Sequence, residues 1–449
     1  MNFVFTSLAI LFAVVVGGSV LYLLTILCAA AVAKVQARRR LDRHDVVGVL
    51  PRIVVLIPAH NEAAVIRSTL RSLALQDYDA ELFDVVVVAD NCTDDTVCIA
   101  ECLGATVLER TDDNLRGKGH ALNWAIKRLT DSSGMKPEAK WPAAVEEKEP
   151  AAIDAFVIVD ADTEAAPDFL SALAVHIAAI DDSRRLWALQ GRYGVLNASD
   201  GWRAALMAGA FELINHVRPL GKDRLGLTVG LMGNGMAFSS ELLRVSTWSG
   251  SLTEDIDFGL DLCRNQRIRV VYVPEAQVKA VMPSTAIDAA SQRSRWENGR
   301  GRLVRERALP LLVEGIRNRN GLLIGAALDL MIPPLVELST LMLIWAVLVC
   351  TGWITGGLPH AEAWVDAVAV TSIGLFVYLL GGLLVAGASA SAYSALIFAP
   401  FYAVWKLCLY LGRGHRSQRG VWVRTARAPR STENSVETAR PAYTRSEGE

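Results

Sequence analysis

The chain has 449 residues, of which 52% are hydrophobic, and its mean hydropathy is +0.30. This composition is too apolar for an ordinary soluble enzyme. The formal net charge of −2 gives no overall field that favours nucleic acid, so nucleic acid is not among the expected partners. The apolar residues gather at 1–33 and 321–411, and a stretch long enough for one large globular domain lies between them.

The first 33 residues carry no charged side chain, and about 20 such residues are enough for a helix to cross a bilayer. No basic residues precede this segment, whereas a cleaved signal peptide carries its positive charge first and has a shorter apolar core. We therefore predict a permanent transmembrane helix over 1–33. By the positive-inside rule, the basic residues that follow place the next domain in the cytoplasm. They are Lys34, Arg38, Arg39, Arg40 and Arg43.

The segment 50–305 alternates apolar β-branched runs with stretches of helical periodicity. Strands are predicted at 52–57, 83–90, 105–110 and 154–162, and helices at 63–76 and 94–104. This alternation predicts βαβ units and an α/β fold with a mostly parallel, Rossmann-like sheet. In such sheets, ligands bind beyond the carboxyl ends of the strands.

Polar side chains follow three of the predicted strands. Asn61 and Glu62 come after the first strand, Asp90 ends the second, and Asp160 and Asp162 end the fourth. Two carboxylates at i and i+2 can converge on a divalent cation, which completes its coordination with substrate phosphates. Neither GxGxxG nor GxxxxGK[ST] follows the first strand, which argues against a dinucleotide fold and an ATPase loop.

Glu254 and Asp255 precede a helical pattern in the segment "SLTEDIDFGLDL". Acidic residues at that position suit the helix dipole. One of them can also act as a general base towards an acceptor hydroxyl, and the two roles are compatible. Shortly before them, Gly233 and Gly235 flank Asn234, which predicts a tight loop with close backbone approach.

The stretch "SQRSRWENGR", residues 291–300, puts Trp296 among three arginines shortly before an apolar segment. Two interpretations compete. Trp296 can anchor an interfacial helix at the lipid headgroups, or it can offer its flat face to a sugar ring.

Seven motifs occur in a characteristic order over about residues 50–305: "IPAHNE", "VVADNCTDDT", "RGKGHALNWA", "VDADT", "GNGMAFS", "TEDIDFGLDL" and "QRSRW". In this order they resemble the membrane-bound family-2 glycosyltransferases, a group that includes synthases of cellulose, chitin, hyaluronan and poly-N-acetylglucosamine. The resemblance implies a cytoplasmic domain of GT-A type, flanked by transmembrane helices. It also implies inverting transfer from a nucleotide sugar, most simply a UDP-sugar, with Mg²⁺ or Mn²⁺ as cofactor.

The same resemblance implies roles for individual residues. Nucleotide binding is expected at Pro58, Ala59, Asn61, Glu62, Asp90, Lys118 and Asp160, and metal binding at Asp160 and Asp162. The expected catalytic base is Asp255, with Glu254 as the second candidate. Acceptor and diphosphate contacts are expected at Gly233, Asn234, Gly235, Gln292, Arg293, Arg295 and Trp296. This favours Trp296 as a stacking platform over a lipid anchor.

The C-terminal part is expected to form interfacial helices at 306–330 and two transmembrane helices at 331–388. The segment 391–411, interrupted by Pro400 and Lys406, is either interfacial or a third span. A basic and then disordered tail is expected at 412–449. The expected location is the inner (plasma) membrane, with several passes.

Three functions remain open at this point. The first expectation is a polysaccharide synthase that extends a glycan in exopolysaccharide or cell-surface polysaccharide synthesis, and QRSRW favours it. Transfer of one sugar to a lipid-linked acceptor or a lipid headgroup is favoured by the small membrane part. A membrane scaffold with an inactive transferase fold is the third, and intact Asp162 and Asp255 argue against it.

Overall fold

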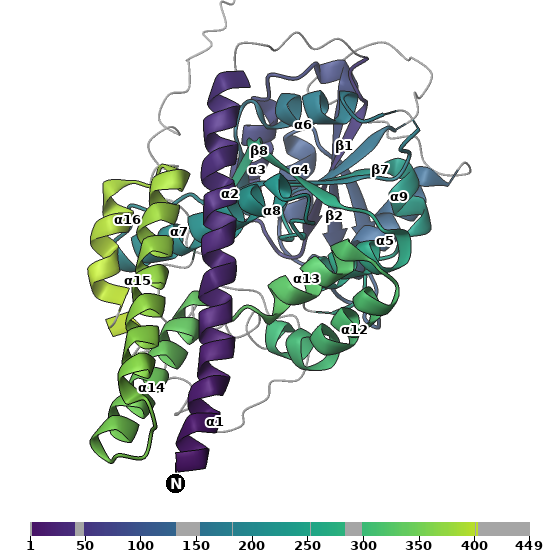
Figure 1. Cartoon of the computed structure of the whole chain (residues 1–449). Coiled ribbons are helices and arrows are strands. Elements are labelled where there is room, and N and C mark those ends of the chain that lie inside the picture. Colours follow the sequence, from purple (N-terminus) through teal and green to yellow (C-terminus); the bar gives the residue numbers. More distant parts are fainter. Residues whose placement is uncertain are drawn as a thin grey trace, which may run out of the picture.

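The computed structural model describes residues 2–40, 49–131, 153–181, 183–251, 253–282, 299–399 and 401–402. An α/β domain is built on an eight-stranded sheet, and a long N-terminal helix runs beside it together with the C-terminal helices (Figure 1).

The first half of the sheet is parallel. It contains β1 (Ile53–Ala59), β2 (Phe83–Asp90), β3 (Thr106–Arg110) and β4 (Ala155–Ile158). β1 lies between β2 and β4, and β3 pairs with β2. All residues of β2 and β4 are buried, as expected for strands covered on both faces. The four predicted strands and the helices α3 (Ile66–Ala74) and α4 (Thr96–Cys102) are confirmed.

Beyond β4 the sheet becomes mixed, in the order β3-β2-β1-β4-β7-β6-β8-β5. β7 (Met236–Ser239) is antiparallel to β4 and to β6 (Ala188–Val195), β6 is parallel to β8 (Val270–Ala280), and β5 (Thr163–Ala165) closes the edge. The β6–β8 register shifts after Gly191, where a Cβ would lie 2.6 Å from the carbonyl oxygen of Ala276. Glycine at this position therefore permits the close approach of the two strands.

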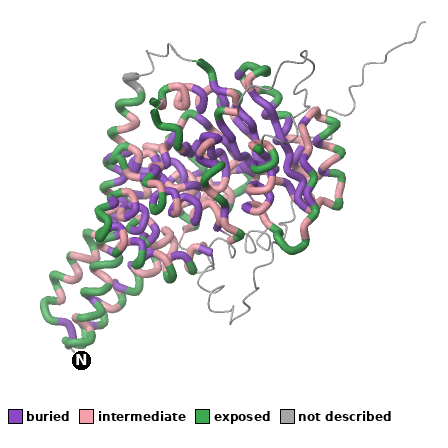
Figure 2. Tube along the Cα trace, turned by 90° about the vertical axis from the view of Figure 1, so that its right-hand side faces the viewer, coloured by how far each residue is buried: buried purple, intermediate pink, exposed green. Residues whose placement is uncertain are grey.

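An apolar layer covers each face of the sheet, because alternate residues of each strand face opposite sides. In β1, Val55 and Ile57 join the layer that contains α3 and α6, whereas Val54 and Leu56 join the layer that contains α5. Figure 2 shows the strands as the most continuously buried part of the molecule. The remaining helices of the domain are α5 (Lys118–Thr130), α6 (Phe169–Ala178), α7 (Trp202–Glu212), α8 (Arg218–Arg224), α9 (Ser240–Val245) and α10 (Glu254–Asp261).

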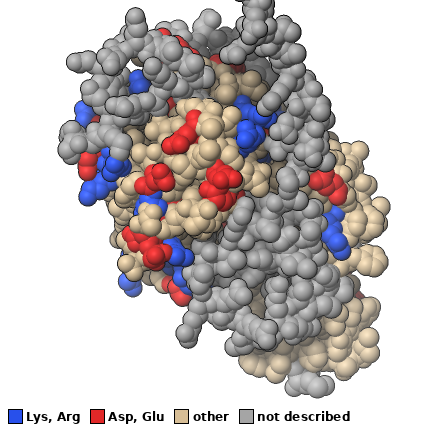
Figure 3. Space-filling view, turned by 180° about the vertical axis from the view of Figure 1, so that it is seen from behind, with Lys and Arg blue, Asp and Glu red and all other residues tan. Residues whose placement is uncertain are grey.

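Among the described residues, three helical segments are long and apolar enough to cross a membrane: Phe3–Ala37, Leu335–Ile354 and Ala361–Ala386. The first consists of α1 (Asn2–Phe12), a π-helical turn (Ala13–Gly17) and α2 (Gly18–Arg40). The other two are α14 and α15. Seen from behind in Figure 3, most of the charged side chains of the described surface lie over the α/β domain. Large apolar side chains of α14 and α15, among them Leu343, Val347, Val370 and Phe376, are exposed, as a lipid-facing surface requires.

Contacts at glycines show in which direction the transmembrane helices run relative to one another. Val20 lies against Gly374, and further along Leu27 lies against Gly381, so α2 and α15 run in the same direction. At the other end Phe5 contacts Gly357, in the connection between α14 and α15. The N-terminal end and this connection therefore lie together, away from the α/β domain (Figure 1).

The predicted interfacial segment 306–330 contains α12 (Leu309–Arg317) and α13 (Gly321–Met331). Their position at the bilayer surface stays a prediction. α16 (Ala390–Ala395) begins the segment 391–411. Residues 403–411 and the predicted tail at 412–449 lie outside the described residues.

Gly221 joins the α/β domain to the first transmembrane segment. A Cβ at this position of α8 would lie 2.2 Å from the carbonyl oxygen of Ile26 in α2. Because backbone cannot yield as a side chain can, Gly221→Ala should cost about 1–3 kcal/mol of stability, read as a lower midpoint of thermal unfolding in detergent. Gly321→Ala is the matched control, since a Cβ there meets nothing within 4 Å. Equal midpoints for the two variants would show that this contact does not hold the domain to the helix.

Candidate active site

A cavity of about 870 Å³ opens at the carboxyl ends of β1, β2 and β4. Its walls come from strand ends, from the loop before α5, from the start of α10, and from α8 and α13. The predicted site residues that line it are Pro58, Ala59, Glu62, Asp90, Lys118, Asp160, Asp162, Gly233, Glu254 and Asp255. Residues far apart in the sequence thus share one cavity.

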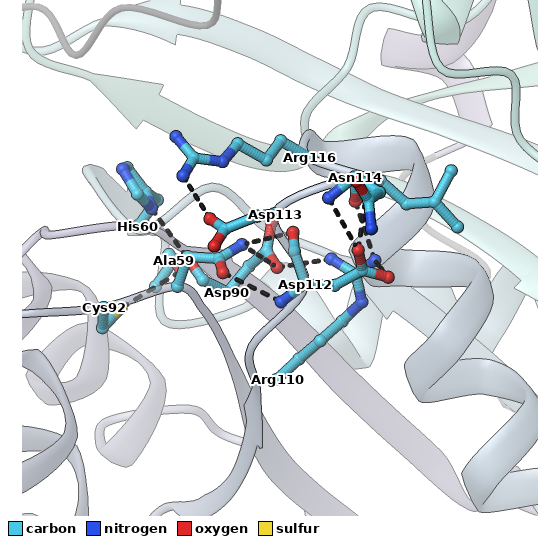
Figure 4. A network of polar contacts seen from close by, with 11 residues as sticks. Ala59, His60, Asp90, Cys92, Arg110, Asp112, Asp113, Asn114 and Arg116 are labelled. Atoms are coloured by element: carbon cyan, nitrogen blue, oxygen red, sulfur yellow. Dashed lines mark hydrogen bonds and ion pairs between the residues drawn. The ribbon is translucent and has the colours of Figure 1, made fainter.

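Asp90 is held in a network of polar contacts (Figure 4). Arg110 Nη1 donates to Asp90 Oδ1 at 2.5 Å, and Asn91 Nδ2 donates to the same oxygen at 3.0 Å. Arg110 also donates to Asp112, which ties the loop before α5 to the ends of β2 and β3. Since Asp90 is only 5% exposed, these donors fix its carboxylate at the cavity wall. Sequence reasoning did not identify Arg110, because only the pairing of β2 with β3 brings it there.

Asn61, a predicted nucleotide-binding residue, does not line the cavity. Its side-chain oxygen accepts hydrogen bonds from the backbone N–H groups of Thr93 and Asp94, at 2.7 and 3.3 Å. Asn61 also has a positive φ of 57°, a conformation that asparagine tolerates better than most residues. In this structure it shapes the turn that carries Glu62.

Asp160 and Asp162 follow β4, and both line the cavity. Lys118, the first residue of α5, forms an ion pair with Asp160 and also donates to the carbonyl oxygen of Gly233. Burial acts to lower the pKa of Lys118, but Asp160 and Glu254 outweigh it and hold that pKa above its ordinary value. Lys118 is therefore a fixed positive charge among carboxylates.

Among the described residues, no group of three or more His, Cys, Asp or Glu side chains is placed to hold a metal ion. Asp160 and Asp162 thus do not form a closed protein cage. They do match the donor set of a cation that takes one or two carboxylates and completes its shell with phosphate oxygens. The residues present therefore fit a divalent cation that binds together with a nucleotide.

The loop Gly233–Gly235 links the two groups of carboxylates. Gly233 has a positive φ of 78°, and a Cβ there would lie 3.1 Å from Asp255 Oδ2. Asn234 and Gly235 do not line the cavity. The fully buried Asn234 accepts a hydrogen bond from the backbone N–H of Asp160 at 3.2 Å. Asn234 therefore helps to position the turn that carries Asp160 and Asp162.

Asp255 lies in the first turn of α10, as predicted. Burial raises the pKa of Asp255 to about 7, and neighbouring Glu254 adds to the rise. Backbone N–H groups and Lys118 act in the opposite direction and do not compensate. The N-terminus of α10 therefore does not by itself keep the Asp255 carboxylate ionised. An acidic group with a pKa near the working pH suits general acid–base catalysis.

Because the pKa of Asp255 is raised, the ionised form that can accept a proton predominates only above about pH 7. We expect kcat/KM to fall as the pH drops through this range. Glu254→Gln removes a like charge, so it should shift this acidic limb to lower pH and keep turnover at pH 8. A pH profile of nucleotide release tests this. Loss of turnover at every pH would identify Glu254 as the base instead.

The far end of the cavity was largely missed by sequence reasoning. Here the cavity is lined by Arg218 of α8, which the sequence places either at the surface or on the acceptor side, and by Lys222, Arg300 and Asp329. Asp329 lies on α13, more than 100 residues from α8, so no local pattern shows that these charges meet.

Gln292, Arg293, Arg295 and Trp296 lie outside the described residues. Their predicted contacts with acceptor and diphosphate, and the choice between a stacking platform and a lipid anchor, stay predictions.

Comparison with known proteins identifies the family. Residues 51–299, more than half of the chain, match the family described as "Glycosyltransferase like family 2". The chain belongs to this family and has a GT-A type fold, as the order of its motifs predicted. The narrower likeness to polysaccharide synthases stays a prediction.

Several curated relatives are similar to this chain. A beta-monoglucosyldiacylglycerol synthase from Nostoc sp. is 27% identical over 289 residues, covering 62% of this chain and 55% of the relative. An N-acetylglucosaminyltransferase from Rhizobium leguminosarum bv. viciae is 26% identical over 257 residues, covering 55% of each. The chain thus spans about half the length of the curated relatives it matches.

Among solved structures, a mannosyltransferase from Pyrobaculum calidifontis, in complex with GDP-Man and Mn²⁺, aligns with a TM-score of 0.46 at 19% identity. The alignment covers 85% of this chain and 98% of that one. A glucosyl-3-phosphoglycerate synthase from Mycobacterium tuberculosis aligns with a TM-score of 0.34 at 22% identity, over 55% of this chain and 76% of that one.

Proposed function

We propose that this protein transfers a sugar, with inversion, from a nucleotide sugar to an acceptor held in the membrane. The observation that carries the proposal is the shared cavity. One end contains the carboxylates of Asp160, Asp162 and Asp255, and the other end is formed by α8 and α13, which meet the first transmembrane segment. A donor from solution and an acceptor from the bilayer can therefore reach the same space.

The chemistry assigned to the chain's own residues is a single displacement. Asp255 accepts the proton of the acceptor hydroxyl, whose oxygen attacks the anomeric carbon opposite the leaving nucleoside diphosphate. Lys118 presents a fixed positive charge at the junction of Asp160 and the Gly233 loop, where it offsets charge on the departing diphosphate. Asp90, fixed by Arg110, presents a carboxylate edge to the N–H groups of a nucleobase.

Asp160 and Asp162 would hold a divalent cation, Mg²⁺ or Mn²⁺, which supplies positive charge to the leaving diphosphate. We propose a UDP-sugar as the donor. Whether the sugar is a hexose or an N-acetylhexosamine is part of the test below.

The proposed location is the inner membrane, with the α/β domain in the cytoplasm. The basic cluster that begins at Lys34 supports this orientation. Lys34 Nζ donates to the carbonyl oxygens of Leu384 and Val385, so the ends of α2 and α15 next to the α/β domain lie together. Cations at helix C-termini also stabilise the carbonyls exposed there.

For the acceptor we favour a membrane lipid over a growing glycan. The cavity leads to the boundary of the transmembrane helices, and the described membrane part comprises three candidate spans. A growing glycan is the second candidate, favoured by the QRSRW motif at Gln292–Trp296. In both cases the reaction at Asp255 is the same.

The test uses the full chain purified in detergent and then returned to lipid. A panel of UDP- and GDP-sugars is screened for nucleotide release, and the product is extracted into organic solvent and sized. A single sugar on a lipid is expected. A long water-soluble product would establish the glycan synthase, and no turnover with any donor would establish an inactive scaffold and overturn the proposal.

A further inference from the structure

A cluster of buried charges forms the end of the cavity opposite the nucleotide site. Arg218 Nη2 donates to Asp329 Oδ1 at 2.6 Å, and Lys222 Nζ donates to Asp329 Oδ2 at 2.8 Å. The hydroxyl of Tyr22, on the first transmembrane segment, also donates to Asp329 Oδ1, at 3.0 Å. Arg300 Nη2 donates to the backbone carbonyl of Leu330, next to Asp329.

This cluster has more positive than negative charge. Three cations, Arg218, Lys222 and Arg300, line this end of the cavity with one carboxylate, Asp329. Glu337 lies close enough to Arg300 to act against the lowering of its pKa by burial, but it does not line the cavity. The lining at this end therefore carries a formal charge of +2, since Asp329 offsets only one of the three cations.

The surplus of positive charge shifts the pKa values of the residues in the cluster. Burial lowers the pKa of Lys222 although Asp329 is its partner, and Arg218 lowers it further. Burial and Arg218 also lower the pKa of Arg300. Burial acts to raise the pKa of Asp329, but Arg218 and Lys222 outweigh it and hold that pKa well below its usual range. Buried like charges are costly unless a further anion joins them.

The cluster is also expected at the edge of the bilayer. A hydrophobic thickness of about 30 Å requires about 20 helical residues, so a span that begins at Phe3 leaves the hydrocarbon near Tyr22. Asp329 precedes α14, the next span, by only a few residues. We therefore expect the charges to lie where lipid headgroups begin, and not in the middle of the membrane.

The cavity that holds this cluster and the catalytic carboxylates also has apolar lining. Tyr193, Phe211, Ile214 and Leu330 line the cavity, and Ile214 is 39% exposed. Tyr193 and Phe211 pack edge to face with ring centroids 5.5 Å apart. An apolar wall beside a cationic pocket matches a molecule with an acyl or prenyl chain and an anionic head.

We propose that Arg218, Lys222 and Arg300 form a binding site for the phosphate-bearing headgroup of a membrane lipid, which presents its hydroxyl to Asp255. This inference rests on the proposed function, whose acceptor it narrows to an anionic lipid. Asp329 serves as the internal counter-ion that keeps the three cations together before the lipid enters. Tyr22 connects this site to the transmembrane helix.

The experiment measures binding without any donor. The full chain in a neutral detergent is titrated with dihexanoyl phosphatidic acid, with dihexanoyl phosphatidylcholine and with inorganic phosphate, and the midpoint of thermal unfolding and the intrinsic fluorescence are followed. Phosphatidic acid is expected to bind at least about tenfold more tightly than phosphatidylcholine, because charge-assisted hydrogen bonds distinguish the two. It should also bind more tightly than inorganic phosphate, which has no chain to contact the apolar wall.

Two substitutions with opposite expected effects on lipid binding distinguish a binding role of the cluster from a purely structural one. Arg300→Gln should weaken phosphatidic acid binding by about tenfold. Asp329→Asn removes the counter-ion, so the added lipid should raise its unfolding midpoint more than that of the wild type. Arg192→Gln is the matched control, because Arg192 is paired with Glu212 and does not line the cavity.

The outcomes are distinguishable. Equal affinity for the two lipids, or an unchanged affinity in Arg300→Gln, overturns the site. Equal affinity for phosphatidic acid and inorganic phosphate overturns its assignment to a lipid. A tenfold loss of UDP binding in Arg300→Gln would assign the cluster to the donor diphosphate and overturn the proposal. Selective lipid binding without turnover of any donor would support the lipid site and refute the transferase function. Transfer to a neutral lipid would support the transferase function and overturn the lipid site.

Discussion

Asp255→Asn is expected to lower sugar transfer by at least about 10²-fold, the lower part of the range that a positioned general base contributes. The asparagine side chain is nearly isosteric, and Asp255 borders the Gly233 loop without holding the nucleotide end of the cavity. Donor affinity should therefore change by no more than a few fold. Single-turnover transfer and binding of UDP, measured on the same preparation, separate the two quantities.

Asp261→Asn is the matched control for this prediction. It makes the same change on the same helix, at a residue that pairs with Arg307 and does not line the cavity. Transfer should stay within a few fold of the wild type. The Asp255→Asn variant could instead lose donor binding, with residual turnover proportional to the fraction of enzyme that has donor bound. Asp255 would then be a binding residue, and Glu254 would become the candidate base.

The acidic end of the cavity could be predicted from the sequence because it depends on local rules. Fully buried apolar runs identified β1, β2 and β4, and parallel strands bring their carboxyl ends to one edge. Asp90, Asp160 and Asp162 therefore had to lie close to one another. Asn61 shows the limit of this reasoning, because its side chain is used by the turn that it begins.

The second half of the sheet and the charged end of the cavity could not be predicted in this way. β7 has only four residues, too few for a periodicity, and its antiparallel pairing depends on the strands around it. The bond between Tyr22 and Asp329 joins residues 307 positions apart. The sequence leaves Arg218 either at the surface or on the acceptor side, and only the packing of α13 brings Arg218 and Lys222 to Asp329.

Asp162→Asn should abolish transfer, and an excess of chelator should do the same to the wild type. Asp162 lines the cavity and accepts a hydrogen bond from the Thr163 hydroxyl at 3.3 Å, and Asp160, which lines it too, is paired with Lys118. With only two protein carboxylates, the cation depends on each of them and on the nucleotide. The variant should therefore bind Mn²⁺ at least about tenfold more weakly in the presence of UDP, as measured by electron spin resonance.

Asp168→Asn serves as the control for that measurement, because Asp168 precedes α6 and does not line the cavity. Its Mn²⁺ affinity and its transfer rate should match those of the wild type. Full activity of the wild type in excess chelator would refute the metal role of the acidic pair. Lys118, already paired with Asp160, would then be the main positive charge available to the leaving diphosphate, and Lys118→Met should abolish transfer where Asp162→Asn does not.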